Sequence, residues 1–468
     1  MDLAAKMTGG ILRQVRIEQS CRRLDRLIAV ADEWIGQRHD QDETGQYATQ
    51  LGVLRKAVVE PLGELRKIAD GLSLVHDTGR VFAACRTSDT RAELVRRVFT
   101  YYQEKFDQRR DHARGPMLRA ADEVVWSCWA EPFRNAIYRD PAITMRPAPL
   151  PYIEPSYSPA AVPRDDPPAG LTAERDDAVL LAYLDRLPIP LIALPAICAD
   201  DPWWLAYVGH EVGHHLQHDL ADDWSLVKAF GNLAETASRS AGDANPARWR
   251  TWGAEIFADI CSVYSMGPAA VYGIMQLELD EAAKMMVGKA KYPPPLVRLG
   301  LMAAVAGQLG LEVTGALKSA GLDTTALPQA AAIAAVAAAA RDDPLAGRGP
   351  FEGLLGWEQN AFAPGGTIDV LREGLRDRLQ LRVRPDIRTA RLLTSAAVAA
   401  WEEVAGLADA QEREEQRGKL ADRYLSAVVK GREEGTRAAG QQAPPGTATL
   451  PDDLTRLLVE SIPDDWET

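Results

Sequence analysis

Positive charge is in the minority in this chain of 468 residues. There are 53 lysines and arginines against 66 aspartates and glutamates, which gives a formal net charge of −13. Proteins that bind nucleic acid or anionic membranes broadly need a basic face. We therefore expect neither nucleic acid nor membrane among the partners of this protein.

Cysteine and long apolar runs are scarce as well. The five cysteines are dispersed and no two form a CxxC pair, which argues against a disulfide framework and favours a reducing compartment. The first residues lack the apolar stretch of a signal peptide. The most apolar later runs, LGLMAAVAGQLGL and AAAIAAVAAAA, are too short and too rich in alanine and glycine to span a bilayer. These features predict a cytoplasmic protein.

Helical periodicity dominates what is present. Between residues 8 and 138, apolar residues recur at three- and four-residue steps, with breaks expected at DTG (77–79) and TSDT (87–90). Residues 141–170 are rich in proline and indicate a linker or an extended wrap over the surface. The fold class predicted is mainly α, with a zincin-like catalytic core that contains a small edge β-sheet and is flanked by helical regions.

Composition and breaks divide the chain into five parts. The parts are an N-terminal helical region (1–140), the proline-rich linker (141–170), a metallopeptidase core (171–310), a C-terminal helical region (311–440) and a disordered tail (441–468). Within the core we expect a helix at 172–187 and then a short apolar strand, PIPLIALPAI, whose prolines suit a sheet edge. Further helices are expected at about 202–219 and from about 243 to the Gly267-Pro268 stop.

Histidine is also scarce, but most of the histidines lie close together in the sequence. The chain has seven, and four of them lie in VGHEVGHHLQHDL (208–220). His210, Glu211 and His214 form the HExxH pattern within the helix expected at 202–219. Residues four apart lie on one helix face, so both imidazoles can bind one zinc ion. Glu211 is offset to act as general base on the water that zinc activates.

A third ligand is available downstream. A catalytic zinc site needs three protein ligands and one open position. Glu255 in TWGAEIFADICSVYSMG is an acid on the second expected helix, and Asp259 follows on the same face. A carboxylate surrounded by apolar residues needs a charged or metal partner, so we expect Glu255 to bind the metal. Asp259 would hydrogen-bond a ligand histidine and fix its tautomer.

The pattern resembles the gluzincin metallopeptidases over about residues 188–300. HEVGH followed by EIFAD is similar to the group of CAAX prenyl proteases and heat-shock membrane proteases. HEVGHHLQH followed by AEIFADI also resembles the ImmA/IrrE group, and the choice between the two groups stays open. The first group commonly has a His-Pro…Arg element after its third ligand, and Tyr292-Pro293 with Arg298 resembles a variant of it. That resemblance implies that the Tyr292 phenol could donate a hydrogen bond to the developing oxyanion, with Tyr264 as a competing candidate.

Other ligand sets fit less well. A metzincin would need histidine at position 220, where Leu220 stands. Cys198 is an upstream thiol of the kind that deformylase-like sites use. His218 lies one turn beyond His214 and is expected to be a partly exposed helix residue, while His215 points elsewhere.

These residues together predict an intracellular zinc-dependent endopeptidase that acts on a peptide or protein substrate. The strand PIPLIALP would offer its free edge to an extended peptide. The helical flanks suggest regulation through a protein partner. The alternative is a non-catalytic helical interaction protein that retains a zinc site.

Overall fold

The computed structural model describes residues 3–41, 45–164, 168, 171, 187–221, 225–345, 348–377, 383–432 and 456. The helix expected at 172–187 and the tail expected from 441 lie almost entirely outside them. The chain divides into two compact units. One comprises Met1–Asp107, Val162–Pro190 and Glu434–Thr468, and the other comprises Gln108–Ala161 and Leu191–Glu433.

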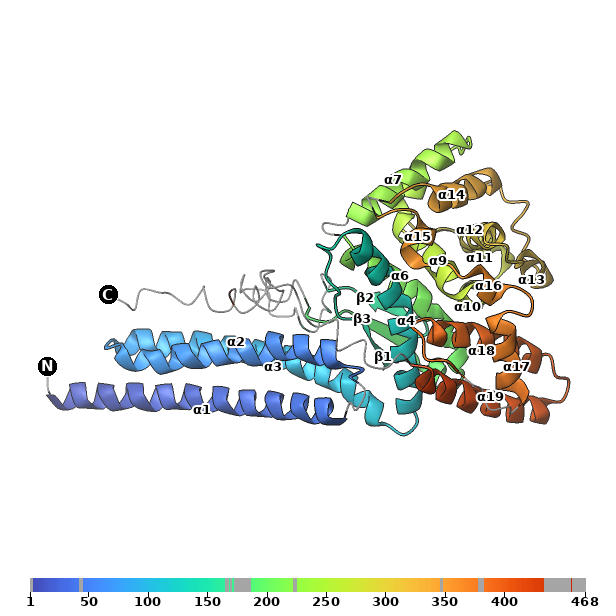
Figure 1. The fold of residues 1–468 in the computed structure, drawn as a ribbon. Helices are drawn as coiled ribbons and strands as arrows, with labels where there is room; N and C mark the ends of the chain where they lie inside the picture. The colour runs from blue at the N-terminus through green and yellow to red at the C-terminus, as the bar shows by residue number, and fades with distance from the viewer. Residues whose placement is uncertain are drawn as a thin grey trace. The chain divides into compact units, whose positions relative to one another are not determined.

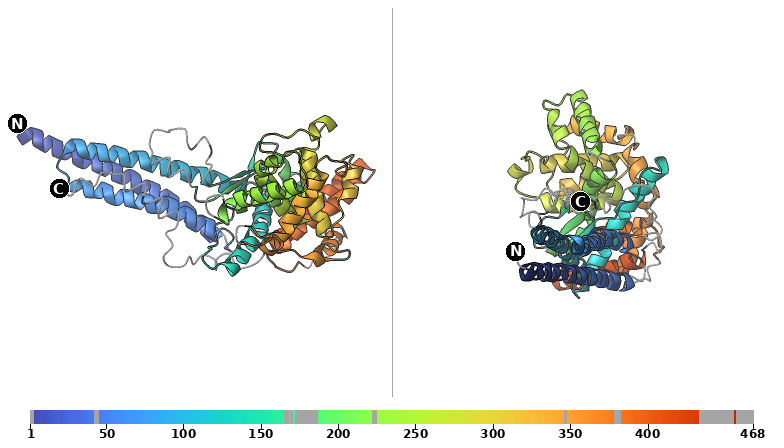
Figure 2. Two further views of the ribbon diagram at one scale, coloured as in Figure 1. Left: turned by 90° about the horizontal axis from the view of Figure 1, so that it is seen from above. Right: turned by 90° about the vertical axis from the view of Figure 1, so that its left-hand side faces the viewer.

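The first unit contains three long helices that run side by side (Figures 1 and 2). They are α1 (Leu3–Gln41), α2 (Ala48–Gly71) and α3 (Thr78–Asp107), with the 3₁₀ turn η1 (Leu72–Leu74) after α2. Their facing sides are apolar, and Trp34 of α1 packs edge-on against Phe99 and Phe106 of α3. The helical periodicity of this region is therefore confirmed.

The break expected at TSDT is wrong, because α3 continues through it. The hydroxyls of Thr87 and Thr90 donate to carbonyls one turn back, at 3.3 and 3.0 Å, so their side chains bond within the helix. Asp89 accepts from Arg16 of α1 at 2.6 Å. A polar sequence that looks like a turn is thus held helical by the neighbouring helix.

The second unit carries the sheet and the remaining helices. Its elements are η2 (Gln108–Arg110), α4 (Gly115–Arg139), β1 (Leu150–Glu154), β2 (Ala160–Val162), β3 (Leu191–Pro195), η3 (Ala196–Ala199), η4 (Pro202–Tyr207), α6 (Val208–Asp219), α7 (Ser225–Ser240), α8 (Ala247–Thr251), α9 (Gly253–Met266), α10 (Pro268–Glu278), α11 (Ala282–Met285), α12 (Pro295–Gln308), α13 (Thr314–Ser319), α14 (Ala330–Asp342), α15 (Phe351–Leu355), α16 (Gln359–Phe362), α17 (Thr367–Asp377), α18 (Thr389–Ala405) and α19 (Ala410–Lys430).

Helix α9 is the centre of this unit. It contacts α6, α7, α10, α12, α15 and α18, and nearly every one of its residues is buried. Apolar side chains such as Ile256, Phe257 and Ile260 are fully enclosed. The two helices expected around the histidine motif are present in part: the first opens as the 3₁₀ segment η4 before α6, and the second is split at Trp252 into α8 and α9. Its end at Gly267 is as expected, since that glycine has a positive φ of 56°.

The sheet has three strands in the order β1-β3-β2 and is mixed. Strand β3 pairs in parallel with β1, with Leu191 opposite Leu150 and Pro195 opposite Glu154. The expectation that the strand at 188–195 has a free edge is therefore wrong, because β3 is central. Its residues are all buried, and such a fully apolar run suits a central strand better than an edge.

Both outer strands come from the proline-rich segment. The outer side of β1 is already bonded: the Gln108 amide accepts from Ile153 N at 2.7 Å and donates to Ile153 O at 3.0 Å, and Arg109 donates to Pro151 O at 2.8 Å. Side chains here take the place of a further strand. Strand β2 is the more exposed outer strand, with no buried residue.

The chain is mainly helical with one small mixed sheet. Among the described residues, no helix combines the length and the apolar character that crossing a bilayer requires.

Candidate metal centre

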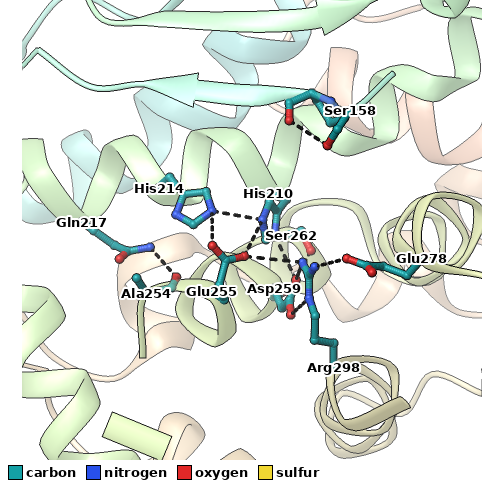
Figure 3. A network of polar contacts seen from close by, with 11 residues as sticks. Ser158, His210, His214, Gln217, Ala254, Glu255, Asp259, Ser262, Glu278 and Arg298 are labelled. Atoms are coloured by element: carbon teal, nitrogen blue, oxygen red, sulfur yellow. Dashed lines mark hydrogen bonds and ion pairs between the residues drawn. The ribbon is translucent and has the colours of Figure 1, made fainter. Parts of the chain in front are cut away.

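Three predicted ligands converge in the second unit. His210 and His214 lie one turn apart on α6, and Glu255 faces them from the first turn of α9 (Figure 3). The two histidine Nε2 atoms are 3.1 Å apart, and each lies 3.6 Å from an oxygen of the Glu255 carboxylate. Two ligand atoms bonded to one tetrahedral zinc ion at its usual bond lengths are about 3.3 Å apart. The three side chains therefore fit around a single metal ion.

Two glycines let the ligand-bearing helices approach closely. A Cβ on Gly213 would lie 2.8 Å from Ala258 Cα and 3.0 Å from Cys261 Cβ of α9. One turn earlier, a Cβ on Gly209 would lie 3.3 Å from Ser262 Cα. Carbon atoms that are not bonded to each other normally stay about 3.5 Å or more apart. The absence of side chains at these positions sets the spacing across which Glu255 meets the histidines.

Asp259 takes the position expected of it behind the first histidine. Its Oδ1 is 2.9 Å from His210 Nδ1, and its side chain is fully buried. A carboxylate at Nδ1 favours the tautomer with hydrogen on Nδ1, which leaves the lone pair of Nε2 directed at the metal position. The predicted role of Asp259 is consistent with this geometry.

Arg298 of α12 clamps Asp259 from the other side. Its Nε and Nη2 donate to the two Asp259 oxygens at 3.0 and 2.8 Å, and Nη1 donates to Glu278 at 2.5 Å (Figure 3). Arg298 is 3% exposed, so this is a buried bidentate pair. Burial acts to raise the pKa of Asp259, but the Arg298 charge outweighs it and holds that pKa well below its usual value.

The pKa values of the two candidate ligand histidines are shifted in opposite directions. Burial acts to lower the pKa of His210, but hydrogen bonds to Asp259 and Glu255 outweigh it and raise this pKa to about 10. For His214, burial and the neighbouring His210 charge lower the pKa to about 3. The two carboxylates therefore favour positive charge at this position. A divalent cation bound here would supply that charge in place of a proton on His210.

Glu211 lies beside the ligands without being one of them. It is buried at 5% exposure, and burial raises the pKa of its carboxyl to about 7. The backbone N–H of Ala161 in β2 donates to this carboxylate. Carboxyls that serve as general acid or base commonly have pKa values raised into this range. The same contact places strand β2 at the site.

The two candidate tyrosines differ in position. Tyr292 is about half exposed, and the Glu255 charge is the largest influence raising the pKa of its phenol, followed by burial. Its side chain therefore belongs to the surroundings of the metal position. Tyr264 is buried and stacks on Phe351 with ring centroids 6.1 Å apart. With 2% of its surface exposed, Tyr264 belongs to the hydrophobic core.

The remaining candidates are not members of the metal-binding group His210, His214 and Glu255. Cys198 is fully buried, and burial raises the pKa of its thiol to about 12, which disfavours the thiolate that binds metals. His215 contacts the carbonyl of Leu191 in β3 through Nε2 at 2.9 Å. His218 is partly exposed, as expected.

Sequence reasoning missed three contributors. Glu278, at the end of α10, joins the network only because α10 and α12 are neighbours in space, and no local pattern marks it. Ala161 contributes a backbone group, which carries no signal in the sequence at all. The role of Gly213 likewise emerges only from the structure, where its lack of a side chain allows α9 to approach.

No family model, no curated protein and no solved structure matches this chain. What the site can do is therefore argued from its own residues.

Proposed function

We propose that this protein is a zinc-dependent peptide hydrolase of the gluzincin type. One observation carries the proposal. Three side chains that can bind a metal ion meet at one buried position with tetrahedral spacing, and a further carboxylate, Glu211, lies beside them without being a ligand. A structural zinc site normally uses four protein ligands rich in thiolate. Two imidazoles and one carboxylate leave a position open for a reactant.

The donor set suits zinc and also other borderline metals, so the metal itself is part of the proposal. When bound, zinc would act as a Lewis acid on the scissile carbonyl and lower the pKa of a water molecule. His210, His214 and Glu255 would hold it. Asp259, itself held ionised by Arg298, would keep the His210 lone pair directed at the ion.

The protein residues supply the proton transfers. The Glu211 carboxylate would accept a proton from the attacking water and return it to the amide nitrogen as that bond breaks. The raised pKa of Glu211 makes both directions of transfer easier near neutral pH. The Tyr292 phenol would donate a hydrogen bond to the carbonyl oxygen as negative charge develops there.

The substrate chain would lie along β2. The outer side of β1 is bonded by Gln108 and Arg109, and β3 is central, so among the described strands β2 is the one that can accept another. Ala161 of β2 donates to Glu211, and this contact supports β2 as the strand beside the proposed reacting groups. An extended peptide paired with β2 would carry its backbone past the metal. A small sheet above two ligand-bearing helices is the zincin-like arrangement that we propose for this core.

Metal content and cleavage together test the proposal. Zinc, iron and manganese would be measured in the purified protein and in the variants His214→Ala and Glu211→Gln. We expect near-stoichiometric zinc in the wild type and Glu211→Gln, and its loss in His214→Ala. A peptide library should be cleaved by the wild type alone. Zinc binding without any cleavage would favour the non-catalytic interaction protein. If neither the wild type nor either variant contains metal, these residues do not form a metal site.

A further inference from the structure

The segment Leu279–Tyr292 begins and ends at the metal centre. It follows Glu278, the last residue of α10, and precedes α12, which carries Arg298. Glu278 and Arg298 are joined at 2.5 Å, and Arg298 also holds Asp259. The two ends of the segment are therefore tied to each other and to the site.

The segment exposes an unusual amount of apolar side chain. Leu279, Met286, Val287 and Tyr292 are 50%, 40%, 65% and 49% exposed. They make up four of the twelve exposed large apolar residues in the part of the chain that the structure describes. Exposed apolar side chains that gather in one place commonly mark a binding surface.

The same segment carries two lysines, Lys289 and Lys291, that form no ion pair within the described part of the chain. Lys289 and Tyr292 close a tight turn, in which each backbone N–H donates to the carbonyl of the other, at 3.0 and 3.1 Å. The turn presents Lys289 and Lys291 to solvent, and neither pairs with an acid among the described residues. Lys284, in contrast, is already paired with Asp280 at 3.1 Å. Two lysines without an acidic partner on one hydrogen-bonded turn are notable in a chain of net charge −13.

We propose that residues 279–292 bind the substrate chain beside the metal centre and select peptides in which an apolar residue is followed or preceded by acidic residues. This rests on the proposed function. The unpaired Lys289 and Lys291 complement acidic side chains, and Met286 and Val287 offer apolar contact next to them. Tyr292 lies at the end of the turn, and the Glu255 charge raises the pKa of its phenol. A peptide held by this turn would therefore lie beside the proposed reacting groups.

Binding can be measured separately from cleavage. The protein would be the full-length Glu211→Gln variant, and the probes would be fluorescent synthetic peptides with one Phe-Leu centre flanked by glutamate, glutamine or lysine. Fluorescence anisotropy gives the Kd of each. We expect the glutamate-flanked peptide to bind roughly tenfold more tightly than the glutamine-flanked one at low salt, and the lysine-flanked one to bind least. The difference should shrink as salt is added.

Charge reversal supplies the decisive comparison. In Lys289→Glu/Lys291→Glu the order of the three peptides should invert, while Lys318→Glu, at an exposed site on α13, should leave it unchanged. Val287→Ser should weaken binding of the Phe-Leu peptides about threefold and leave a peptide with a Gly-Ser centre unaffected. Equal Kd values for the three peptides, or an order that survives charge reversal, would overturn the proposal.

Two further outcomes are distinguishable. If the double variant loses sedimentation with phosphatidylserine vesicles and the wild type shows no peptide preference, the segment is a membrane-binding surface and the proposal fails. If the peptides bind in the expected order but the metal-loaded wild type cleaves none of them, hydrolysis fails and the peptide-binding surface stands. If the wild type cleaves the peptides but shows no charge preference, the proposed hydrolysis stands and the proposed peptide-binding surface fails.

Discussion

Gly213→Ala tests whether close contact between α6 and α9 builds the metal centre. The added Cβ would lie 2.8 Å from Ala258 Cα, against an ordinary contact of about 3.5 Å. The helices must therefore separate by about 0.7 Å (3.5 − 2.8). Metal–ligand distances tolerate only about ±0.2 Å, so His214 and Glu255 could no longer hold the ion together as well.

We expect this variant to bind zinc about 10- to 100-fold more weakly, the loss typical of displaced supporting groups. Overpacking should also lower the free energy of unfolding by about 1–3 kcal/mol. Zinc affinity would be measured by competition with a chromophoric chelator, and stability by denaturant unfolding with and without zinc.

Two other glycines serve as controls. A Cβ on Gly307 of α12 meets nothing within 4 Å, so Gly307→Ala should leave zinc affinity unchanged and stabilise the helix by up to about 1 kcal/mol. Gly209→Ala, with its nearest contact at 3.3 Å, should fall between the two. Wild-type zinc affinity in Gly213→Ala would refute the reasoning, as would an equal loss in Gly307→Ala.

Three further predictions concern the groups around the metal. Asp259→Asn keeps the shape but removes the charge that pairs with Arg298 and His210, so zinc affinity by chelator competition should fall about 10- to 100-fold; a change below twofold would contradict the assigned role. Tyr292→Phe should keep full zinc content and KM while kcat falls about 100-fold, and an unchanged kcat would exclude the phenol as a donor to the oxyanion. Removal of zinc by a chelator should abolish cleavage and lower the thermal midpoint, because zinc at 100 times its Kd contributes about 2.7 kcal/mol to stability. His214→Ala should show no such shift, and a chelator effect of equal size in that variant would mean that the stabilising ion is bound elsewhere.

Local features of the sequence were enough to predict the ligand set. The HExxH spacing places His210 and His214 on one face of any helix, whatever surrounds that helix. Glu255 and Asp259 were recognisable because carboxylates in an apolar helix need a partner. The helical character of both units follows in the same way from short-range periodicity.

Contacts between distant segments decided the rest. Whether a strand is central or outer depends on which other strands pair with it, so the sequence of β3 could not exclude a free edge, and the pairing with β1 did. The TSDT segment stays helical because Asp89 meets Arg16 of another helix. Arg298, Glu278 and Ala161 come to the site from three separate elements. Spacing within one turn of helix therefore specifies the two histidines of the candidate metal site, whereas packing brings Glu255 to them and sets the groups that orient and surround them, which only the folded structure determines.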